Sequence, residues 1–424
     1  MHDLRMVRDQ IDALREGMRR RGKLDIYGPT IDEAEALDKA RRRSIHAVEE
    51  QKAARNTATA EVGRRKRVGE NADELMARAR AIGEQIAMLE KELDATQARL
   101  DELMLGIPNI TMDEVPAGDE SGNVVMETWG EPREAGTVLP HWEIGETLGL
   151  LDLARGAKIS GSGFVVYRGA GARLLRSMMN AMLDLHTTEF GYEELNVPAV
   201  VNRATMTGTG QLPKFADDMY KLADDDLFLI PTSEVPITNL YRDEMLAAAD
   251  LPRGFTAYSP CFRREAGSAG KDTRGVMRVH EFDKVELVRY CAPEDGEGQL
   301  ELLLSHAKAV LERFELPYRV LLLAAGDTGF ASAKTYDLEV FAPGVGKWLE
   351  VSSCSLCTDF QARRANIRYR PAPGEKPRFI HTLNGSGLAF PRIFASLLEH
   401  HQQPDGSVRI PEALRRWFGT DRIG

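Results

Sequence analysis

The sequence predicts an α+β protein in which a mostly antiparallel β-sheet with flanking helices follows an N-terminal antiparallel α-helical coiled-coil arm. Two observations support this fold class. Apolar residues recur at alternating spacings of four and three between Asn71 and Leu105, which is the coiled-coil period. Beyond residue 110, short runs of alternating apolar residues follow one another without the regular crossover helices of a parallel sheet. At 424 residues the chain is also long enough for more than one core.

Two long helices are expected to form the arm, which spans about residues 31–105. The apolar seam of the second helix runs through Leu75, Ala79, Ile82, Ile86, Leu89, Leu93, Thr96, Leu100 and Leu103. The first helix, from Ile31 to Val68, has a looser seam, and Gly69 with Asn71 breaks the pattern between them. A short break favours a hairpin about 50 Å long over pairing with a second chain, although dimerisation is the commoner use of a coiled coil.

The boundary between two domains is expected near residue 110, giving 1–110 as a helical domain and 111–424 as a sheet domain. Gly106-Ile-Pro-Asn109 ends the arm, and the turn-rich segment Pro116 to Gly122 follows it. Within the second domain, strands are predicted at 227–230, 276–288, 318–323 and 347–352, and helices at 171–190 and 300–314.

Composition restricts the class of protein further. The formal net charge is −10, yet residues 39–67 contain ten basic and three acidic side chains, or about +7. Basic residues on the first arm helix and at the arm tip favour a phosphate-rich ligand as the partner. These residues are Arg41, Arg42, Arg43, Arg64, Arg65, Lys66 and Arg67. A solvated charged face is the alternative. Four scattered cysteines favour a reducing cytoplasm over a disulfide framework, and no apolar run is long enough for a membrane span.

The densest group of polar residues lies between Cys261 and Glu286, which is predicted to form a strand, a glycine-containing loop and a returning strand. Period-two alternation places Arg263 with Glu265 on one face. It also places Arg278, His280, Phe282, Lys284 and Glu286 together on the return. Such a face needs a ligand or an ion-pair network to offset its desolvation, and the pattern leaves both open.

Three further segments have side chains suited to anions or to hard cations. Gly385-Ser-Gly387 leads into a helical stretch that begins near Arg392, where backbone amides could bind an anion. Thr232-Ser-Glu234 and Glu350-Val-Ser-Ser353 follow apolar strands and supply hydroxyl and carboxylate oxygens, which suit magnesium held with nucleotide phosphates. Each segment taken singly could also be an ordinary strand end.

In combination these segments resemble the seryl-tRNA synthetase family of the class II aminoacyl-tRNA synthetases. The resemblance covers essentially the whole chain. It rests on the arm and on the following segments: Gly191 to Pro198, Gly208 to Phe215, Thr232 to Pro236, Phe262 to Glu286, Glu350 to Arg364 and Leu383 to Arg392. It implies an enzyme that activates L-serine with ATP as seryl-adenylate and transfers the seryl group to the 3′ end of tRNA(Ser), with tRNA(Sec) as a further candidate.

The resemblance also implies the roles of individual residues. Catalysis would depend on Arg263, Glu350 and Arg392. The serine-binding residues would be Thr232, Ser233, Glu234, Arg263, Glu286, Asn384 and Ser386. The ATP-binding residues would be Arg263, Arg264, Glu265, Val279, Phe282, Glu350, Val351, Ser352, Ser353 and Arg392. Glu350 and Ser353 would bind Mg²⁺. A homodimer formed around Gly191 to Pro198 is implied as well, and the basic arm would bind the tRNA.

Three alternatives and two departures from the family pattern accompany this interpretation. A ligase that loads an amino acid onto a carrier protein is one alternative, and the basic arm argues against it. A non-catalytic paralogue would be marked by the loss of site residues, and none is lost among Arg263, Glu286, Glu350 and Arg392. A purely structural coiled-coil protein would not explain the second domain. Gly163 stands where the family usually has arginine, and Phe390-Pro391 precedes Arg392 in a slot that is commonly smaller. The pair Cys354 and Cys357 supplies two soft ligands, so no zinc site is expected. His280 is expected to be a structural or loop residue, because an ionised carboxylate nucleophile needs no general base.

Overall fold

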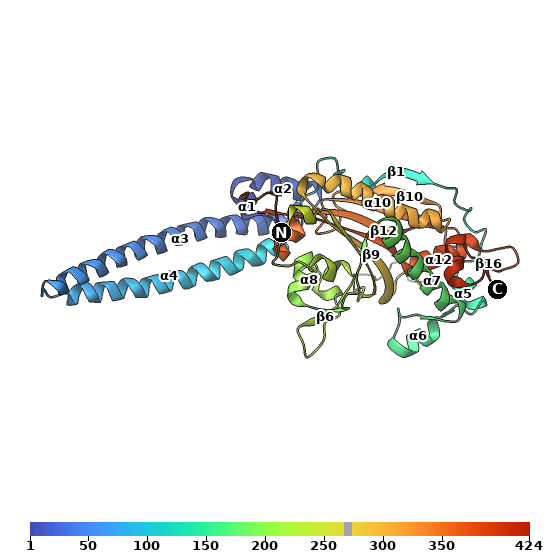
Figure 1. Cartoon of the computed structure of the whole chain (residues 1–424), viewed down its shortest axis with the longest axis horizontal. Coiled ribbons are helices and arrows are strands. Elements are labelled where there is room, and N and C mark those ends of the chain that lie inside the picture. The colour runs from blue at the N-terminus through green and yellow to red at the C-terminus, as the bar shows by residue number, and fades with distance from the viewer. Residues whose placement is uncertain (267–273) are drawn as a thin grey trace. The chain divides into compact units, whose positions relative to one another are not determined.

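The computed structural model describes residues 1–266 and 274–424, which form two compact units. One unit contains residues 2–19 and 23–107, and the other contains Met1, residues 20–22 and residues 108–424. The first unit is helical, and in it two long helices run side by side (Figure 1). Its elements are α1 (Leu4–Asp9), α2 (Ile11–Arg20), α3 (Leu24–Arg67) and α4 (Asp73–Gly106).

The pairing of α3 with α4 confirms the predicted intramolecular hairpin. All nine residues of the predicted α4 seam are buried or half-buried, and Leu100 is fully buried. On α3, Asp38 is 1% exposed and forms ion pairs with three arginines. One of them is Arg42, whose Nε lies 3.0 Å from Asp38 Oδ2. A buried carboxylate is tolerated here because several cations compensate its charge.

An eight-stranded sheet forms the second unit, in the order β1-β10-β11-β12-β15-β9-β8-β4. Every neighbouring pair is antiparallel except β4 with β8, which confirms the predicted sheet type. The strands are β1 (Val124–Trp129), β10 (Tyr318–Leu322), β11 (Lys334–Ala342), β12 (Lys347–Thr358), β15 (His381–Ala389), β9 (Glu281–Cys291), β8 (Arg253–Phe262) and β4 (Glu193–Glu194).

Helices and small sheets surround this central sheet. The helices are α5 (His141–Thr147), α6 (Leu153–Ser160), α7 (Ala170–Asp184), α8 (Arg203–Thr209), α9 (Glu234–Thr238), α10 (Gly296–Arg313), α11 (Phe360–Ala365), α12 (Phe390–His401) and α13 (Glu412–Phe418). The short strands are β2 (Leu151–Asp152), β3 (Val166–Tyr167), β5 (Val200–Asn202), β6 (Leu227–Leu229), β7 (Met245–Ala247), β13 (Arg368–Arg370), β14 (Arg378–Phe379), β16 (Val408–Arg409) and β17 (Arg422–Ile423).

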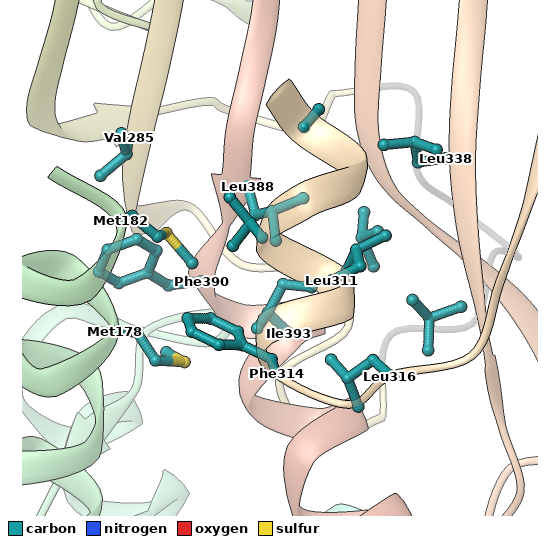
Figure 2. Close-up of a cluster of buried hydrophobic side chains, with 14 of the residues drawn as sticks. Met178, Met182, Val285, Leu311, Phe314, Leu316, Leu338, Leu388, Phe390 and Ile393 are labelled. Carbon is teal, nitrogen blue, oxygen red and sulfur yellow. The ribbon is translucent and has the colours of Figure 1, made fainter. Parts of the chain in front are cut away.

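The main hydrophobic core lies where α7, α10 and α12 pack against the sheet. Met178 and Met182 from α7 meet Leu311 from α10 and Ile393 from α12 in this core (Figure 2). Phe390, one of the two departures from the family pattern, is 1% exposed within the same cluster. The larger side chain therefore serves packing at the start of α12.

Strand β9 shows how the sheet separates its core from its polar face. Val285 and Leu287 belong to the core under α7, α10 and α12, whereas Val288 and Tyr290 belong to a second apolar cluster. Because side chains alternate along a strand, Phe282, Lys284 and Glu286 share the side of Val288 and point away from the main core. The polar face predicted for this strand is thus present.

The boundaries of the β8–β9 hairpin correct the predicted strands. β8 ends at Phe262 and β9 begins at Glu281, so Arg263, Glu265, Arg278 and His280 lie outside the strands instead of alternating on them. Glu265 has a φ of +52°, which a strand does not permit. The predicted loop also includes residues 267–273, which lie outside the described residues. Among the helices of the described chain, none is long and apolar enough to cross a membrane.

Candidate active site

Two adjoining cavities open on the polar face of the central sheet. Their volumes are about 180 Å³ and about 460 Å³. We call them the first and the second cavity, respectively. Both are lined by Arg263, Glu265, Arg278, Lys284, Glu350 and Ser386. This set contains three cations and two carboxylates, so the junction between the cavities is strongly charged and suited to an anionic ligand.

Strands β9 and β15 supply the floor of the site. Phe282 lines the first cavity, Lys284 lines both, and Glu286 lines the second. Ser386 on β15 is paired directly opposite Glu286, so its side chain faces the same way. Lys284 Nζ lies 2.5 Å from Glu286 Oε2, and the two side chains are 6% and 1% exposed. This buried ion pair therefore presents a cationic and a carboxylate group to a polar ligand in the second cavity.

Glu350 and Ser353 lie on the same side of β12 because the strand contains a bulge. Strict alternation would place residues three apart on opposite faces. Glu350 is paired with Glu339 and Ser352 with Leu338, so Val351 is an extra residue in the ladder. Beyond the bulge, Glu350 and Ser353 both line the second cavity.

A buried carboxylate supports this part of the site from the neighbouring strand. Asp337 on β11 is paired opposite Ser353 and accepts a hydrogen bond from its side chain. Burial raises the pKa of Asp337 well above its usual range, and the nearby Glu350 charge raises it further. Within the described residues, Asp337 Oδ1 has no hydrogen-bond partner.

Arg263 enters the site from the end of β8. Its guanidinium lies over the Phe282 ring, 5.2 Å from the ring centroid, which is a cation–π contact. Its backbone N–H donates to His280 O at 2.9 Å, which fixes the loop where the strands separate. Glu265 and Arg278 form an ion pair beside it. Although these residues are not on strands, the loop brings them to the two cavities.

Arg392 stands in the first turn of α12 and reaches back across the first cavity to β12. Its Nη1 donates to Glu350 O at 2.6 Å and lies 3.5 Å from Glu350 Oε2. Pro391 in the same turn has no N–H, so it leaves no unsatisfied donor there. The guanidinium is thereby held over the cavity by the strand that contributes Glu350.

Glu234, at the start of α9, is a half-buried carboxylate that lines the second cavity. Burial raises its pKa to about 7, and the charge of Glu286 acts in the same direction. A hydrogen bond from Gln361 and the charges of Lys284 and Arg263 oppose this rise. Thr232 Oγ1 accepts a hydrogen bond from the Glu234 backbone N–H at 3.2 Å, which fixes the Thr232 side chain at the start of α9.

The remaining predicted residues are divided between the cavities and their surroundings. Val279 and Val351 line the first cavity, and Asn384 lines the second. Three other predicted residues do not line either cavity. Ser233 is fully buried and its hydroxyl donates to Ala257 O, Ser352 donates to Ser386 O at 2.6 Å, and Arg264 is exposed. Ser352 thus supports the backbone of Ser386.

Several residues of the site were not predicted. Lys284 was placed on the predicted polar face but was given no role in binding or catalysis. Its spacing of two from Phe282 and Glu286 is a signal that could have identified it as a site residue. Gln211, Phe215 and Met277 also line the cavities, but no spacing relates them to the other residues.

Gly163 and His280 form a close contact beside the site. A side chain at position 163 would meet His280 Cδ2 at 2.3 Å, and Gly163 has a φ of +83°. The His280 ring stacks on Phe164 with centroids 5.4 Å apart, and His280 Nδ1 lies 3.0 Å from Arg263 O. His280 is therefore a loop contact, as expected, and glycine at 163 is what this packing admits.

The four cysteines are free and buried. In residues 1–266 and 274–424, no three or more His, Cys, Asp and Glu side chains are grouped to hold a metal ion. A magnesium ion differs from zinc in this respect, because it commonly takes one or two protein ligands together with substrate phosphates and water. The hard oxygens of Glu350 and Ser353, next to the orphaned Asp337 Oδ1, fit such a partial site.

The predicted tRNA-binding cations lie on α3 within the helical unit. Asp38 forms ion pairs with Arg41 and Arg42, and Glu61 forms ion pairs with Arg64 and Arg65. The three others, Arg43, Lys66 and Arg67, are exposed. Ion pairs on an exposed helix are weak, so all seven cations can still contribute to a positive surface.

Comparison with known proteins gives consistent matches to both units. Residues 1–111 match the family described as seryl-tRNA synthetase N-terminal domain, and residues 219–401 match the class II tRNA synthetase core domain shared by the G, H, P, S and T enzymes. The serine–tRNA ligase of Gemmatimonas aurantiaca is 67% identical over 420 residues, which is 99% of each chain. That of Geobacillus kaustophilus is 52% identical, again over 99% of each chain.

Solved structures agree with these sequence matches. The seryl-tRNA synthetase of Pyrococcus horikoshii, crystallised with ATP, superposes with a TM-score of 0.95 at 37% identity and covers 100% of this chain and 99% of its own. The cytoplasmic serine–tRNA ligase of Naegleria fowleri, solved with AMP, gives a TM-score of 0.88 at 27% identity, with 100% and 98% covered. With its helical arm, its antiparallel sheet and these full-length matches, the chain belongs to the seryl-tRNA synthetase family of class II aminoacyl-tRNA synthetases.

Proposed function

We propose that this chain is a serine–tRNA ligase that forms seryl-adenylate from L-serine and ATP and then transfers the seryl group to the 3′ end of tRNA(Ser). The observation that carries this proposal is the shared lining of the two cavities. Arg263 stands at their junction and faces both. A planar guanidinium in that position can contact the serine carboxylate and the α-phosphate at once, which offsets the repulsion between two anions as they react.

The second cavity is the proposed serine site. The α-amino group would be held by Thr232 and Glu234, and the side-chain hydroxyl by Glu286 with Ser386 and Asn384. Glu286 is 1% exposed, and its oxygens have no hydrogen-bond partner in the described residues apart from the ion contact with Lys284. A buried acceptor that alanine leaves unpaired favours serine, by up to about 10⁴-fold where such discrimination is strongest.

The first cavity is the proposed ATP site. The Phe282 ring would stack on the adenine, and Glu265 would accept from its amino group. Arg392 would cover the other face of the ring and reach the γ-phosphate, while Val279 and Val351 complete the lining. Arg263 now lies over Phe282, so it would move from the ring to the α-phosphate when the nucleotide enters.

Glu350 and Ser353 would hold a magnesium ion with the phosphates. The ion, when bound, would neutralise charge on the phosphate oxygens as pyrophosphate leaves. The chain's own contribution is geometric: the bulge at Val351 brings the two side chains to one side, and Asp337 accepts a hydrogen bond from the Ser353 hydroxyl. The Ser353 oxygen would then keep its lone pairs for the ion.

We further propose that residues 1–110 bind the tRNA through the basic surface of the arm, and that tRNA(Sec) is a further acceptor. A homodimer through Gly191 to Pro198 belongs to the same proposal. The four buried free thiols support a cytoplasmic location.

Amino-acid-dependent ATP/pyrophosphate exchange tests the activity directly. Exchange is expected with serine alone among the twenty amino acids, and Arg263→Ala should abolish it. Arg370→Ala, which changes an exposed arginine of β13, is the matched control and should keep wild-type exchange. Exchange with another amino acid would refute the substrate, and no exchange at all would favour a non-catalytic paralogue.

The arm requires a separate assay. Replacing Arg43, Lys66 and Arg67 with glutamine should weaken tRNA binding and flatten its salt dependence. Binding releases fewer counterions from the tRNA when fewer phosphates are neutralised by cationic side chains. Serine-dependent exchange should not change. Unaltered aminoacylation at all salt concentrations would contradict the proposed role of the arm.

A further inference from the structure

Gln361, on α11, makes three side-chain hydrogen bonds next to the second cavity. Its Nε2 donates to Glu234 Oε1 at 2.7 Å and to Thr209 O at 3.2 Å. Its Oε1 accepts from Thr382 Oγ1 at 2.7 Å. The side chains of Gln361 and Thr382 are essentially inaccessible, at 1% and 0% exposure. The amide does not itself line either cavity, so it can act on a ligand only through Glu234.

The partners determine which way the amide faces. Thr209 O can only accept, so the nitrogen must face it and the neighbouring Glu234. The Thr382 hydroxyl then has the amide oxygen as its acceptor. A flipped amide would set its oxygen against two acceptors, which is costly in a buried site. Four segments, including α8, α11 and β15, thus converge to present one N–H to Glu234.

We propose that Gln361 is a positioning residue for amino-acid recognition, whose amide holds the Glu234 carboxylate in the orientation that receives the α-amino group of serine. The inference rests on the proposed function and adds a residue to it. Hydrogen bonding to the ionised form of a carboxylate favours that form. Without Gln361, Glu234 would be both less well oriented and less often charged.

The charges around Glu234 show why such help is needed. Glu286 on β9 disfavours the ionised form, and the Cys357 thiol on β12 also lies near Glu234. Lys284 on β9 and Arg263 after β8 favour it, yet Lys284 is paired with Glu286. The Gln361 amide is therefore a neutral donor that stabilises the carboxylate without adding a charge that would repel the ammonium group of serine.

Steady-state exchange kinetics with Gln361→Met test this role. Methionine keeps the unbranched shape and removes both donors. We expect kcat/KM for serine to fall about 10- to 100-fold near neutral pH, which is the range for a lost hydrogen bond to a charged group. KM for ATP should stay within about twofold, because neither Gln361 nor Glu234 lines the first cavity.

The pH profile separates positioning from a general loss of structure. In the wild type, kcat/KM for serine should fall as the pH drops through about 7, as Glu234 takes up a proton. In Gln361→Met this decline should move to higher pH. Thr382→Val leaves the amide oxygen of Gln361 without its donor, so the amide is held less firmly. This variant should move the decline in the same direction by less, and it serves as the test if Gln361→Met does not fold.

Gln85→Met, the same change at an exposed position of α4, is the control and should match the wild type. An unmoved pH profile in both site variants, or an equal loss of kcat/KM for serine and for ATP, would overturn the inference while the proposed function stands. A wild type without serine-dependent exchange would instead overturn the proposed function, and with it this inference.

Discussion

Replacing Glu234 with glutamine should stabilise the ligand-free protein at neutral and alkaline pH while impairing serine binding. The pKa of Glu234 is raised from 4.5 to about 7 by burial and by the charge of Glu286. Between these two pH values the folded chain holds a proton that the unfolded chain has released. The stability of the wild type must therefore fall as the pH rises through this window.

The magnitude follows from the size of the shift. One pKa unit corresponds to about 1.4 kcal/mol, so a rise from 4.5 to about 7 costs the folded protein about 3 kcal/mol at any pH above the window. Glutamine cannot ionise and escapes this cost, and its amide oxygen can still accept from Gln361 at the position of Oε1. The advantage of Glu234→Gln over the wild type should be near zero below pH 4.5 and largest above pH 7.

Calorimetric melting of ligand-free protein at several pH values measures this difference. Glu375→Gln changes an exposed glutamate and should melt like the wild type throughout. In the same preparations, Glu234→Gln should raise KM for serine, since a neutral amide binds an ammonium group less well than a carboxylate does. A difference in melting temperature that is the same at pH 5 and pH 8 would refute the assigned cause of the shift.

Three further predictions concern other parts of the molecule. Glu399→Ala should lower the free energy of unfolding, measured with urea, by about 3 kcal/mol or more. It removes the Glu399 oxygen that lies 2.9 Å from His141 Nδ1 and leaves this fully buried ring N–H without an acceptor. An effect below about 1 kcal/mol would be inconsistent with this role. Phe282→Leu should raise KM for ATP about tenfold and leave KM for serine unchanged, and equal effects on both would place the ring elsewhere in the reaction. Ile86→Asp changes a 3% exposed seam position and should unfold the arm, seen as a loss of helical signal in circular dichroism. It should abolish aminoacylation while serine-dependent exchange persists, and a loss of exchange would contradict this prediction.

The arm and the sheet were the parts of the fold that sequence patterns predicted best. The seam from Leu75 to Leu103 repeats a local period, and local periods require no knowledge of distant residues. The antiparallel sheet followed from alternating runs without crossover helices. The strand ends were predicted less well. The segment from Val276 to His280 has strand-like alternation, but the Val276 N–H donates to His141 Nε2 and the His280 N–H donates to Gly163 O, not to a neighbouring strand.

The family resemblance names more of the residues that line the two cavities than spacing alone does. Glu350 and Ser353 are three residues apart, and alternation alone separates them; the bulge at Val351 depends on the register with β11. Arg263 and Glu265 were expected to share a strand face, yet they meet in the cavities through a loop.

The sequence by itself determined the helical hairpin, the sheet class, the polar face of β9 and, through its motifs, the family. All of these depend on residues close together in the chain or on motifs in a fixed order. Only the tertiary structure decided that Arg263 faces two cavities, that Glu234 lies beside Glu286, and that Gln361 reaches Glu234. Burial and electrostatic coupling arise between residues distant in sequence, so the raised pKa of Glu234 has no signature in the chain until the fold partly buries it beside Glu286.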